Sequence, residues 1–368
     1  MYIKKLELSE FKNHDSASFT FCSGFNCFYG KNGAGKTNLL DAIHYLSFGR
    51  SYFHRNDLQS IRFDSTYSII KSKVESANEE IELSVGLSST EKKTIRKNGA
   101  ALTKLSDVIG VLPCVMIAPA DIQLINGNSE ERRRLMDRTI SLVNSNYLHQ
   151  LIQHNRLLEA RNEMLKQFAL NRHVDDLALE AIDFQLHPLL DSIHRHRKDF
   201  VEKCLSQTTT IYNALTASDE HIEIKYASNL ENKTGKELLT AQKTNDVYAQ
   251  RTKFGVHRDE LDILINAMPL KKFGSQGQIK TTTIALNLAT YHFLSAETGK
   301  LPILLLDDIF EKIDDHRATR LMEEIGKSGF GQIFITDTNL KRLEEKLLEL
   351  ECEKKFFNIE TNNEEVTA

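Results

Sequence analysis

The stretch "FYGKNGAGKTNLLDAI", residues 28 to 43, contains Gly30-x-x-x-x-Gly35-Lys36-Thr37, the spacing of a phosphate-binding loop. The apolar run "GFNCFYG" leads into this loop, and "KTNLLDAIHYLSFG" follows it without a helix breaker. The order predicts a strand, a glycine-rich loop and a helix, which is the context in which the motif binds nucleotides. The alternative, a glycine-rich turn without a ligand, is disfavoured by these flanking segments.

The residue types of the loop suit phosphate chemistry. Gly30, Gly33 and Gly35 let the backbone curl so that its N–H groups face phosphate oxygens. Lys36 places a cation at the β- and γ-phosphates, and Thr37 offers a hydroxyl to Mg²⁺. The N-terminus of the following helix adds its dipole. We therefore expect ATP and Mg²⁺ at this loop.

The second half of such a site is a buried strand that ends in carboxylates. In "LPILLLDDIFEKID", the apolar run 303–306 precedes Asp307 and Asp308, as in a parallel strand buried on both faces. Asp307 would hold Mg²⁺, and Asp308 could orient or deprotonate the attacking water. A strand that merely ends in a polar turn is the alternative.

Lys36 and Asp307 lie 271 positions apart, so the core must be assembled from both ends of the chain.

A short polar turn, "GSQGQ", precedes the acidic strand. Ser275 and Gly277 stand at the head of a long apolar-periodic helix that we expect to begin at Gln278. An ordinary capped core helix is one interpretation, since Ser is a common N-cap residue. The other is an ABC-type signature, in which a serine and a helix N-terminus meet the γ-phosphate held by a second subunit.

Composition excludes several classes of protein. The chain has 368 residues, 40% hydrophobic and 27% charged, which predicts a soluble protein of two or three domains. The N-terminus alternates polar and apolar residues and does not resemble a signal peptide. No apolar run reaches the ~20 residues of a membrane span, so we expect a cytoplasmic protein. A net charge of −4 predicts that any DNA contact is local.

The scattered cysteines favour a reducing compartment. Cys22 and Cys27 could suggest a metal pair, but no second Cys or His pair follows them. We therefore expect these two cysteines to be buried, small apolar side chains.

The remaining sequence predicts an antiparallel sheet and a helical insertion. Alternating runs such as "YSIIKSKVES" and "EIELSVGLS" indicate the sheet. From Glu130 the residue pattern predicts two long helical runs, and Pro188 is expected to kink or divide the second run. We predict an N-terminal head segment at 1–125, an inserted helical lobe at 126–245 and a C-terminal head segment at 246–368.

Six motifs in order resemble the RecF family of bacterial recombination and repair proteins, in the SMC-like branch of the ABC ATPases. They span nearly the whole chain and read "FKNH", "GKNGAGKTNLLDAIHYLSFGRSYF", "PADIQLINGNSEERRRLMD", "GVHRDELD", "GSQGQ" and "LLLDDIFEKIDDHR". The resemblance implies an α/β ABC-type P-loop ATPase head with a small antiparallel β subdomain. It also implies that the inserted α-helical lobe is a short version of the SMC arm.

The resemblance further implies an ATP-driven homodimer with weak, DNA-stimulated ATPase activity. Ser275 and Gly277 of one subunit would close the phosphate loop of the other. The closed dimer would grip DNA near a junction of single and double strands, mainly through backbone contacts. It would help to load the recombinase at gaps in repair and replication, together with RecO and RecR.

Residue roles carry over from the same resemblance. Lys12 in "FKNH" would reach the nucleotide phosphates, and Asp314 would lie at the subunit contact. Lys36, Asp307 and Asp308 would be catalytic, with Thr37 and Asp307 serving the metal. The ATP cradle would consist of Gly30, Lys31, Asn32, Gly33, Ala34, Gly35, Lys36 and Thr37.

The chain departs from the family pattern at three places. Gln276 stands where a basic residue is frequent, so we assign it no phosphate contact. Asp337 and Thr338 occupy the position of the switch histidine of many ABC ATPases, which leaves the sensing of the γ-phosphate open. Gln123 is a candidate metal-contacting glutamine, although its offset fits poorly.

Two basic clusters are candidates for DNA phosphate contacts. One is Arg132, Arg133 and Arg134, and the other is "HRHRK", His194 to Lys198. The alternative is that these are solvated helix faces whose charges pair with nearby carboxylates such as Glu130, Glu131 and Asp199. For His257 and Arg258 in "GVHRDELD" we prefer a structural or DNA-proximal role to a catalytic one.

Two other functions use a phosphate loop. A transporter-type ABC ATPase subunit would need a coupling surface for membrane helices and usually carries its signature close to the loop. A P-loop small-molecule kinase would need an acceptor pocket and would not use "GSQGQ".

Overall fold

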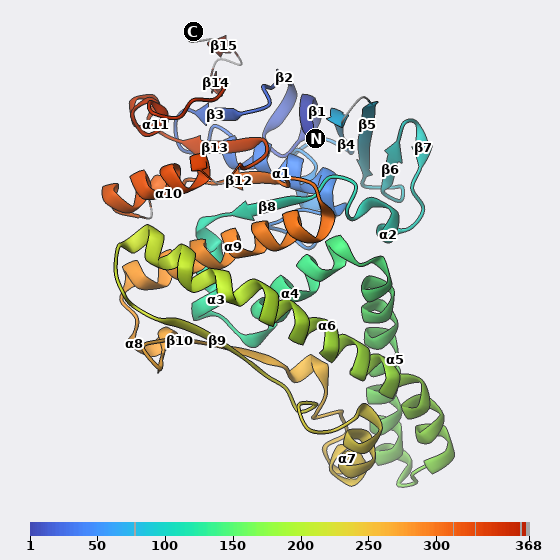
Figure 1. Cartoon of the computed structure of the whole chain (residues 1–368). Coiled ribbons are helices and arrows are strands. Elements are labelled where there is room, and N and C mark those ends of the chain that lie inside the picture. Colours follow the sequence, from blue (N-terminus) through green and yellow to red (C-terminus); the bar gives the residue numbers. More distant parts are fainter. Residues whose placement is uncertain (77–78, 312, 328, 361–362, 366–368) are drawn as a thin grey trace. The chain divides into compact units, whose positions relative to one another are not determined.

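A largely parallel sheet gathers strands from both ends of the chain (Figure 1). In this computed structural model, which describes residues 1–76, 79–311, 313–327, 329–360 and 363–365, the strand order is β15-β14-β3-β13-β12-β8. The strands are β3 (Phe25–Tyr29), β8 (Cys114–Ile117), β12 (Ile303–Leu306), β13 (Ile333–Asp337), β14 (Lys354–Asn358) and β15 (Asn363–Glu365). Every residue of β3, β8, β12 and β13 is buried. The predicted assembly of the core from both chain ends is confirmed.

A second sheet is antiparallel, as predicted, and has the order β2-β1-β4-β5-β6-β7. Its apolar side chains, among them Leu6, Leu8 and Ile70, are buried on one face, while the alternate positions are polar. The strands are β1 (Tyr2–Phe11), β2 (His14–Thr20), β4 (Tyr67–Ser76), β5 (Glu79–Ser88), β6 (Thr94–Lys97) and β7 (Ala100–Ala101).

Helix α1 (Lys36–Phe48) contacts both sheets, through β13 and β8 on one side and β5 on the other. It is therefore buried along nearly its whole length. The two sheets and α1 belong to a compact unit of Met1–Asp121, Thr210–Asp219 and Lys280–Ala368. Its other elements are η1 (Asp57–Ser60), α2 (Leu105–Val108), η4 (Ile309–Glu311), α10 (Asp315–Lys327), α11 (Leu340–Leu347) and most of α9 (Gln276–Thr298).

The second compact unit comprises Ile122–Thr209 and Glu220–Ile279 and is mainly helical. A small antiparallel sheet in the order β11-β10-β9 accompanies the helices. The elements are α3 (Gln123–Asn126), α4 (Ser129–Val143), α5 (Ser145–Asn171), most of α6 (Asp176–Thr216), β9 (Ile222–Ala227), α7 (Gly235–Ala249), η3 (Val256–Arg258), β10 (Glu260–Ile265), β11 (Met268–Pro269) and α8 (Leu270–Phe273), while η2 (Pro119–Ile122) lies mostly in the first unit. β10 pairs with β9 along its length, and the second compact unit includes both strands. The predicted domain boundaries, with a helical lobe at 126–245, stay a prediction.

Two local expectations for the helical segment differ from the structure. The first helical run is divided at Asn144, which ends α4 and whose side chain accepts a hydrogen bond from Tyr147 N at the start of α5. The second run, α6, is not divided at Pro188. The neighbours Leu186 and Leu190 are almost fully buried, and this packing offsets the hydrogen bond that proline removes.

Cys22 and Cys27 are buried, as predicted, and both are free thiols. Within the described residues, no cluster of three or more His, Cys, Asp or Glu side chains is arranged to hold a metal ion. Among the same residues, no helix has both the length and the apolar content needed to cross a membrane.

Candidate nucleotide-binding site

The phosphate loop connects β3 to α1, as the sequence predicts. Gly30, Gly33 and Gly35 all have positive φ, at 147°, 84° and 107°, a region that side chains disfavour. Gly35 is constrained twice, because a Cβ there would lie 2.5 Å from Asn13 Nδ2 and 2.6 Å from His14 Nε2. The glycines are therefore required by the curl of the loop.

Lys36 folds back over the loop that precedes it. Its Nζ donates hydrogen bonds to the carbonyl oxygens of Gly30, at 2.7 Å, and Lys31, at 3.0 Å. Lys36 as a whole is 4% exposed. Folding thus fixes a cation at the loop, where a bound phosphate would need it.

Asp307 follows the last residue of β12 and receives two hydroxyl groups. Thr37 Oγ1 donates to Asp307 Oδ1 at 2.8 Å, and Thr336 Oγ1 donates to the same oxygen at 2.9 Å. Burial raises the pKa of Asp307, and the two hydroxyl donors partly offset this. The predicted pairing of the loop with the acidic strand is present in the fold.

Asp308 adopts an uncommon backbone conformation for a non-glycine residue, with φ at 43°. Its backbone N–H donates to Thr336 Oγ1 at 2.8 Å. Its Oδ1 is buried and has no hydrogen-bond partner among the described residues. Burial, followed by the charge of Asp307, raises the pKa of Asp308 to about 6. An unpartnered buried carboxylate oxygen beside the loop suits a group that meets a ligand or water.

Sequence reasoning missed Thr336 and the partner of Asp337. Asp337 stands at the position of the switch histidine and forms a bidentate pair with Arg342, at 2.7 and 2.8 Å. The parallel register aligns Leu306 of β12 with Ile335 of β13, so Thr336 of β13 lies beside Asp307, the residue that follows β12. A register prediction for these two strands would have found it.

The "FKNH" turn lies against the phosphate loop. His14 Nε2 is 3.2 Å from the carbonyl oxygen of Gly35, and Asn13 Nδ2 donates to that of Gly33 at 3.4 Å. Lys12 Nζ instead pairs with Asp41 Oδ2 of α1 at 2.6 Å. Its predicted contact with nucleotide phosphates stays a prediction.

A further carboxylate reaches the loop from the C-terminal strands. The N–H of Lys31 donates to Glu360 Oε1 at 2.6 Å. The parallel pairing of β14 with β3 ends at Asn358 and Tyr29, which brings the residues after β14 to the edge where the loop begins. Sequence reasoning did not include Glu360.

Ser275 and Gln278 cap α9 reciprocally in the second unit. Gln278 N donates to Ser275 Oγ at 3.2 Å, and Ser275 N donates to Gln278 Oε1 at 2.7 Å, the pattern of a capping box. The helix begins at Gln276, two residues before the expected start. Ser275 and Gln276 are both exposed. The predicted role of Ser275 and Gly277 at a second subunit's nucleotide stays a prediction.

Gln123 and Asp314 occupy helix starts. Gln123 is the exposed first residue of α3. Asp314 Oδ1 accepts a hydrogen bond from Arg317 N at 3.0 Å at the beginning of α10. Metal contact by Gln123 and subunit contact by Asp314 are not tested by these interactions.

The first basic cluster is engaged within the second unit. Arg132 pairs with Glu260 at 2.6 Å. Arg133 donates to the carbonyl oxygen of Asp259 at 2.7 Å, and Arg134 donates to Glu131 at 2.8 Å. The alternative of a helix face paired with nearby carboxylates therefore describes Arg134, whereas Arg132 pairs with a distant carboxylate and Arg133 bonds to a backbone carbonyl.

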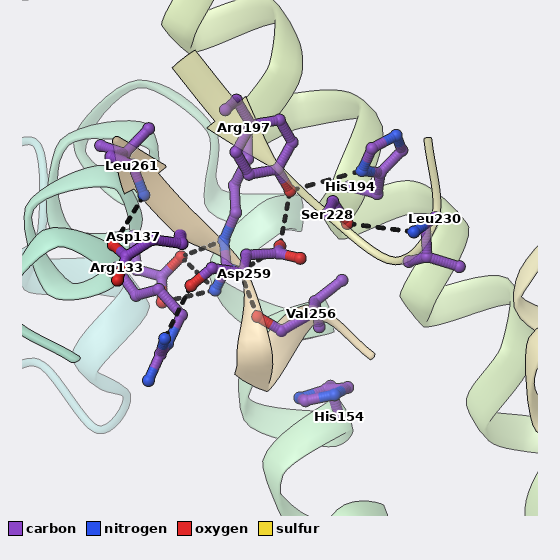
Figure 2. Close-up of polar contacts among 12 residues, drawn as sticks. Arg133, Asp137, His154, His194, Arg197, Ser228, Leu230, Val256, Asp259 and Leu261 are labelled. Carbon is purple, nitrogen blue, oxygen red and sulfur yellow. Dashed lines mark hydrogen bonds and ion pairs between the residues drawn. The ribbon is translucent and has the colours of Figure 1, made fainter. Parts of the chain in front are cut away.

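The second basic cluster contains a buried arginine at the centre of a polar network (Figure 2). Arg197, with a side chain 3% exposed, pairs with Asp259 at 2.7 Å and with Asp137 at 2.9 Å. It also donates to the carbonyl oxygen of Val256 at 2.6 Å. Its neighbour Lys198 pairs with Glu231 at the surface. The network joins α4, α6 and the "GVHRDELD" segment, which fits the structural role preferred for that motif.

Comparison with known proteins agrees with this geometry. The family model described as RecF/RecN/SMC N terminal domain matches residues 2–361. The DNA replication and repair protein RecF of Flavobacterium johnsoniae is 40% identical over 98% of this chain and 100% of its own length. That of Parabacteroides distasonis is 38% identical, covering 98% of each protein. The chain belongs to the RecF family.

Solved structures confirm the predicted fold class for this family member. A structure of the recombination mediator protein RecF-ATP in the RecFOR pathway has a TM-score of 0.86 and 29% identity, covering 100% of this chain and 98% of that one. A Smc head domain from Pyrococcus furiosus, with an extended coiled coil and bound to the C-terminal domain of ScpA, has a TM-score of 0.58 and 17% identity, covering 100% and 96%. The second likeness supports the ABC-type head fold alone.

Proposed function

We propose that the chain is an ATP-hydrolysing, DNA-binding protein of recombinational repair and replication. The observation that carries this proposal is the hydrogen bond between Thr37 and Asp307, beside a lysine folded over a phosphate loop. The solved relative described as RecF-ATP, a recombination mediator protein, supports ATP as the nucleotide. Membership of the RecF family favours this function over a transporter subunit or a small-molecule kinase.

The donor set at the loop fits Mg²⁺. Thr37 and Asp307 offer hard oxygen atoms, and the unpartnered Oδ1 of Asp308 lies in the same acidic segment. Bound Mg²⁺ would neutralise charge on the β- and γ-phosphates. Thr37 and Asp307 would hold it, at the cost of the hydrogen bond that they share in this structure.

Different residues would perform different steps of ATP hydrolysis. The backbone N–H groups of residues 30–37 and the ammonium of Lys36 would stabilise charge on the phosphates. Asp308 would orient the attacking water and accept its proton. Its pKa of about 6 leaves it mostly ionised near neutral pH, and therefore able to act as a base. The product ADP would then dissociate from the loop, and Lys36 could again bond to the carbonyl oxygens of Gly30 and Lys31.

The ATP-bound state is proposed to be a homodimer that closes on DNA at gaps. Ser275 and Gln276 are exposed at the N-terminus of α9, where a second chain can reach them. Helix N-termini stabilise bound phosphates. RecO and RecR enter the proposal as partners because family membership implies them.

The outer face of the antiparallel sheet is a better candidate for DNA contacts than the two predicted clusters. Lys71, Ser84 and Arg96 are cross-strand neighbours on β4, β5 and β6. Lys71 and Arg96 are exposed, and neither has an ion-pair partner within the described residues. A hollow of about 150 Å³ on this face is lined by Lys5, Lys71 and Lys73 with two glutamates. Lys5 and Lys73 pair with Glu7 and Glu80, so Lys71 and Arg96 are the cations on this face that suit a phosphate backbone.

Steady-state hydrolysis tests the proposal. The purified chain is expected to release phosphate from ATP with Mg²⁺, and faster with gapped duplex DNA than without DNA. Asp308→Asn is expected to bind ATP but not hydrolyse it. Equal rates with and without DNA, or transfer of phosphate to a metabolite instead of water, would reject the proposal.

A further inference from the structure

One hydroxyl group connects the two acidic residues at the end of β12. Thr336 Oγ1 donates its hydrogen to Asp307 Oδ1 at 2.9 Å and accepts the backbone N–H of Asp308 at 2.8 Å. A threonine hydroxyl has one donor and two acceptor sites, so this group contacts both residues at once. No carbon side chain of similar size could do so.

The hydrogen bond to Asp308 matters because of that residue's backbone. Asp308 has a φ of 43°, a strained conformation for a non-glycine residue that persists only where the surrounding structure holds it. The acceptor oxygen of Thr336 stabilises the N–H of Asp308 in this conformation. Without it, the N–H would lose its partner, and the peptide between the two carboxylates could rotate.

Thr336 is itself fixed on both sides. It pairs with Phe28 in the register of β13 with β3. The next residue, Asp337, is 1% exposed and accepts hydrogen bonds from Arg342 and from Asn339 N. The hydroxyl is therefore held in place by the central strand and by the first turn of α11.

We propose that Thr336 is a positioning residue for ATP hydrolysis, which sets the orientation of Asp308 relative to Asp307. Together with the Asp337–Arg342 pair, it gives this chain a fixed strand end where many ABC ATPases have a switch histidine. The inference rests on the proposed ATPase function. It concerns turnover rather than nucleotide affinity, because Thr336 hydrogen-bonds to the Asp307 carboxylate and the Asp308 backbone N–H rather than to the loop.

The test replaces Thr336 by valine, which keeps the branched shape, and by serine, which keeps the hydroxyl. Phosphate release gives kcat and KM, and a fluorescent ATP analogue titrated in EDTA gives nucleotide affinity without the metal. Thr336→Val is expected to lower kcat by about 10²-fold, the scale of a small misplacement of a reacting group. Its affinity for the analogue is expected to stay within about threefold of the wild type, because the contacts of the loop are unchanged. Thr336→Ser is expected to keep most of the wild-type kcat.

Thr290→Val is the matched control. Thr290 is 3% exposed and its hydroxyl donates to Leu286 O within α9 at 2.9 Å, so the same substitution removes a buried hydroxyl far from the carboxylates in sequence. The kcat of Thr290→Val is expected to equal the wild-type value. Its change in melting temperature is expected to be similar to that of Thr336→Val. If Thr336→Val does not fold, Thr336→Ser and Thr336→Ala, which differ by the hydroxyl alone, decide the question.

Equal kcat for the valine and serine variants, or for the serine and alanine variants, would overturn the inference. So would a loss of analogue affinity as large as the loss of kcat. A wild-type chain that fails to hydrolyse ATP would instead reject the proposed function, so the two failures are distinguishable.

Discussion

The Oγ1 atom of Thr37 lies 2.8 Å from Oδ1 of Asp307, although 270 positions separate the two residues. The contact depends on β3 and β12 flanking β13 in one parallel sheet. The candidate nucleotide site is therefore complete only when the two ends of the chain fold together. The C-terminal half alone would keep only the hydrogen bond from Thr336 to Asp307, and the N-terminal half alone would leave the Thr37 hydroxyl without this partner.

Thr37 is expected to control the Mg²⁺ requirement. Thr37→Val removes the hydroxyl, so the Mg²⁺ concentration for half-maximal hydrolysis is expected to rise about 10- to 100-fold. Removal of Mg²⁺ by EDTA is expected to stop hydrolysis in the wild type. The measurement is a Mg²⁺ titration at saturating ATP, with Thr37→Ser as the control that keeps the hydroxyl. An unchanged titration curve for the valine variant would contradict the assignment.

Arg197 and Lys198 should differ sharply in their effect on stability. Removal of Arg197 leaves the buried Asp259 without a counter-ion (Figure 2), which typically costs about 3–5 kcal/mol. Lys198 forms an ion pair with Glu231 in which both side chains are 44% exposed, and such pairs contribute about 0–1 kcal/mol. Urea unfolding of Arg197→Ala and Lys198→Ala measures both. Similar losses in the two variants would show that the network is not a stabilising element.

His257 predicts a pH dependence of stability. Burial, the largest cause, lowers the pKa of His257 from 6.5 to about 4. Between these pH values His257 binds a proton in the unfolded chain but not in the folded chain. The stabilising contribution of neutral His257 is therefore complete above pH 6.5, and the free energy of unfolding falls as the pH falls from 6.5 towards 4. The total contribution is about 3 kcal/mol at most. Nearby His154, with its own pKa lowered by burial, acts in the same direction.

Urea unfolding at pH 7.5 and pH 5 checks this dependence. For His257→Gln, the difference in unfolding free energy between the two pH values is expected to shrink by about 2 kcal/mol. His149→Gln is the control, because His149 is exposed. An equal pH dependence in His257→Gln and the wild type would contradict the prediction.

The outer sheet face is expected to contribute to DNA affinity through its charge. Lys71→Ala with Arg96→Ala removes two unpaired cations, so the slope of log affinity against log salt should decrease by about 2 for duplex DNA. Lys233→Ala with Lys236→Ala is the control, since both lysines are exposed in the other unit. Fluorescence anisotropy at several salt concentrations gives the slopes. Equal slopes for the two double variants would place the contacts elsewhere.

The sequence was sufficient where chemistry needs residues at fixed spacing. The loop residues, Asp307 and Asp308 could be recognised because glycines, a lysine and a strand ending in carboxylates are demanded by phosphate binding. The antiparallel sheet followed from alternation of polar and apolar residues. The ABC-type head was implied by the resemblance of six motifs to the RecF family.

Partners that are set by tertiary packing could not be predicted. Arg132 was a candidate for contacts with DNA phosphates, but it pairs with Glu260, which lies 128 positions away. No local sequence pattern predicts that pairing. Lys12 was expected at the phosphates, whereas its observed contact, Asp41, comes from the buried side of α1. Thr336 carries no motif of its own, because its place depends on the register of two strands that are distant in sequence.

The central claim is that two copies of the chain complete the nucleotide site. Analytical ultracentrifugation of the wild type and of Ser275→Arg, each with and without ATP and Mg²⁺, tests it most directly. The account predicts a monomer without ATP, a dimer with ATP for the wild type, and a monomer in both conditions for Ser275→Arg, which still binds ATP. A wild type that stays monomeric at saturating ATP, or a Ser275→Arg variant that dimerises as well as the wild type, would contradict it.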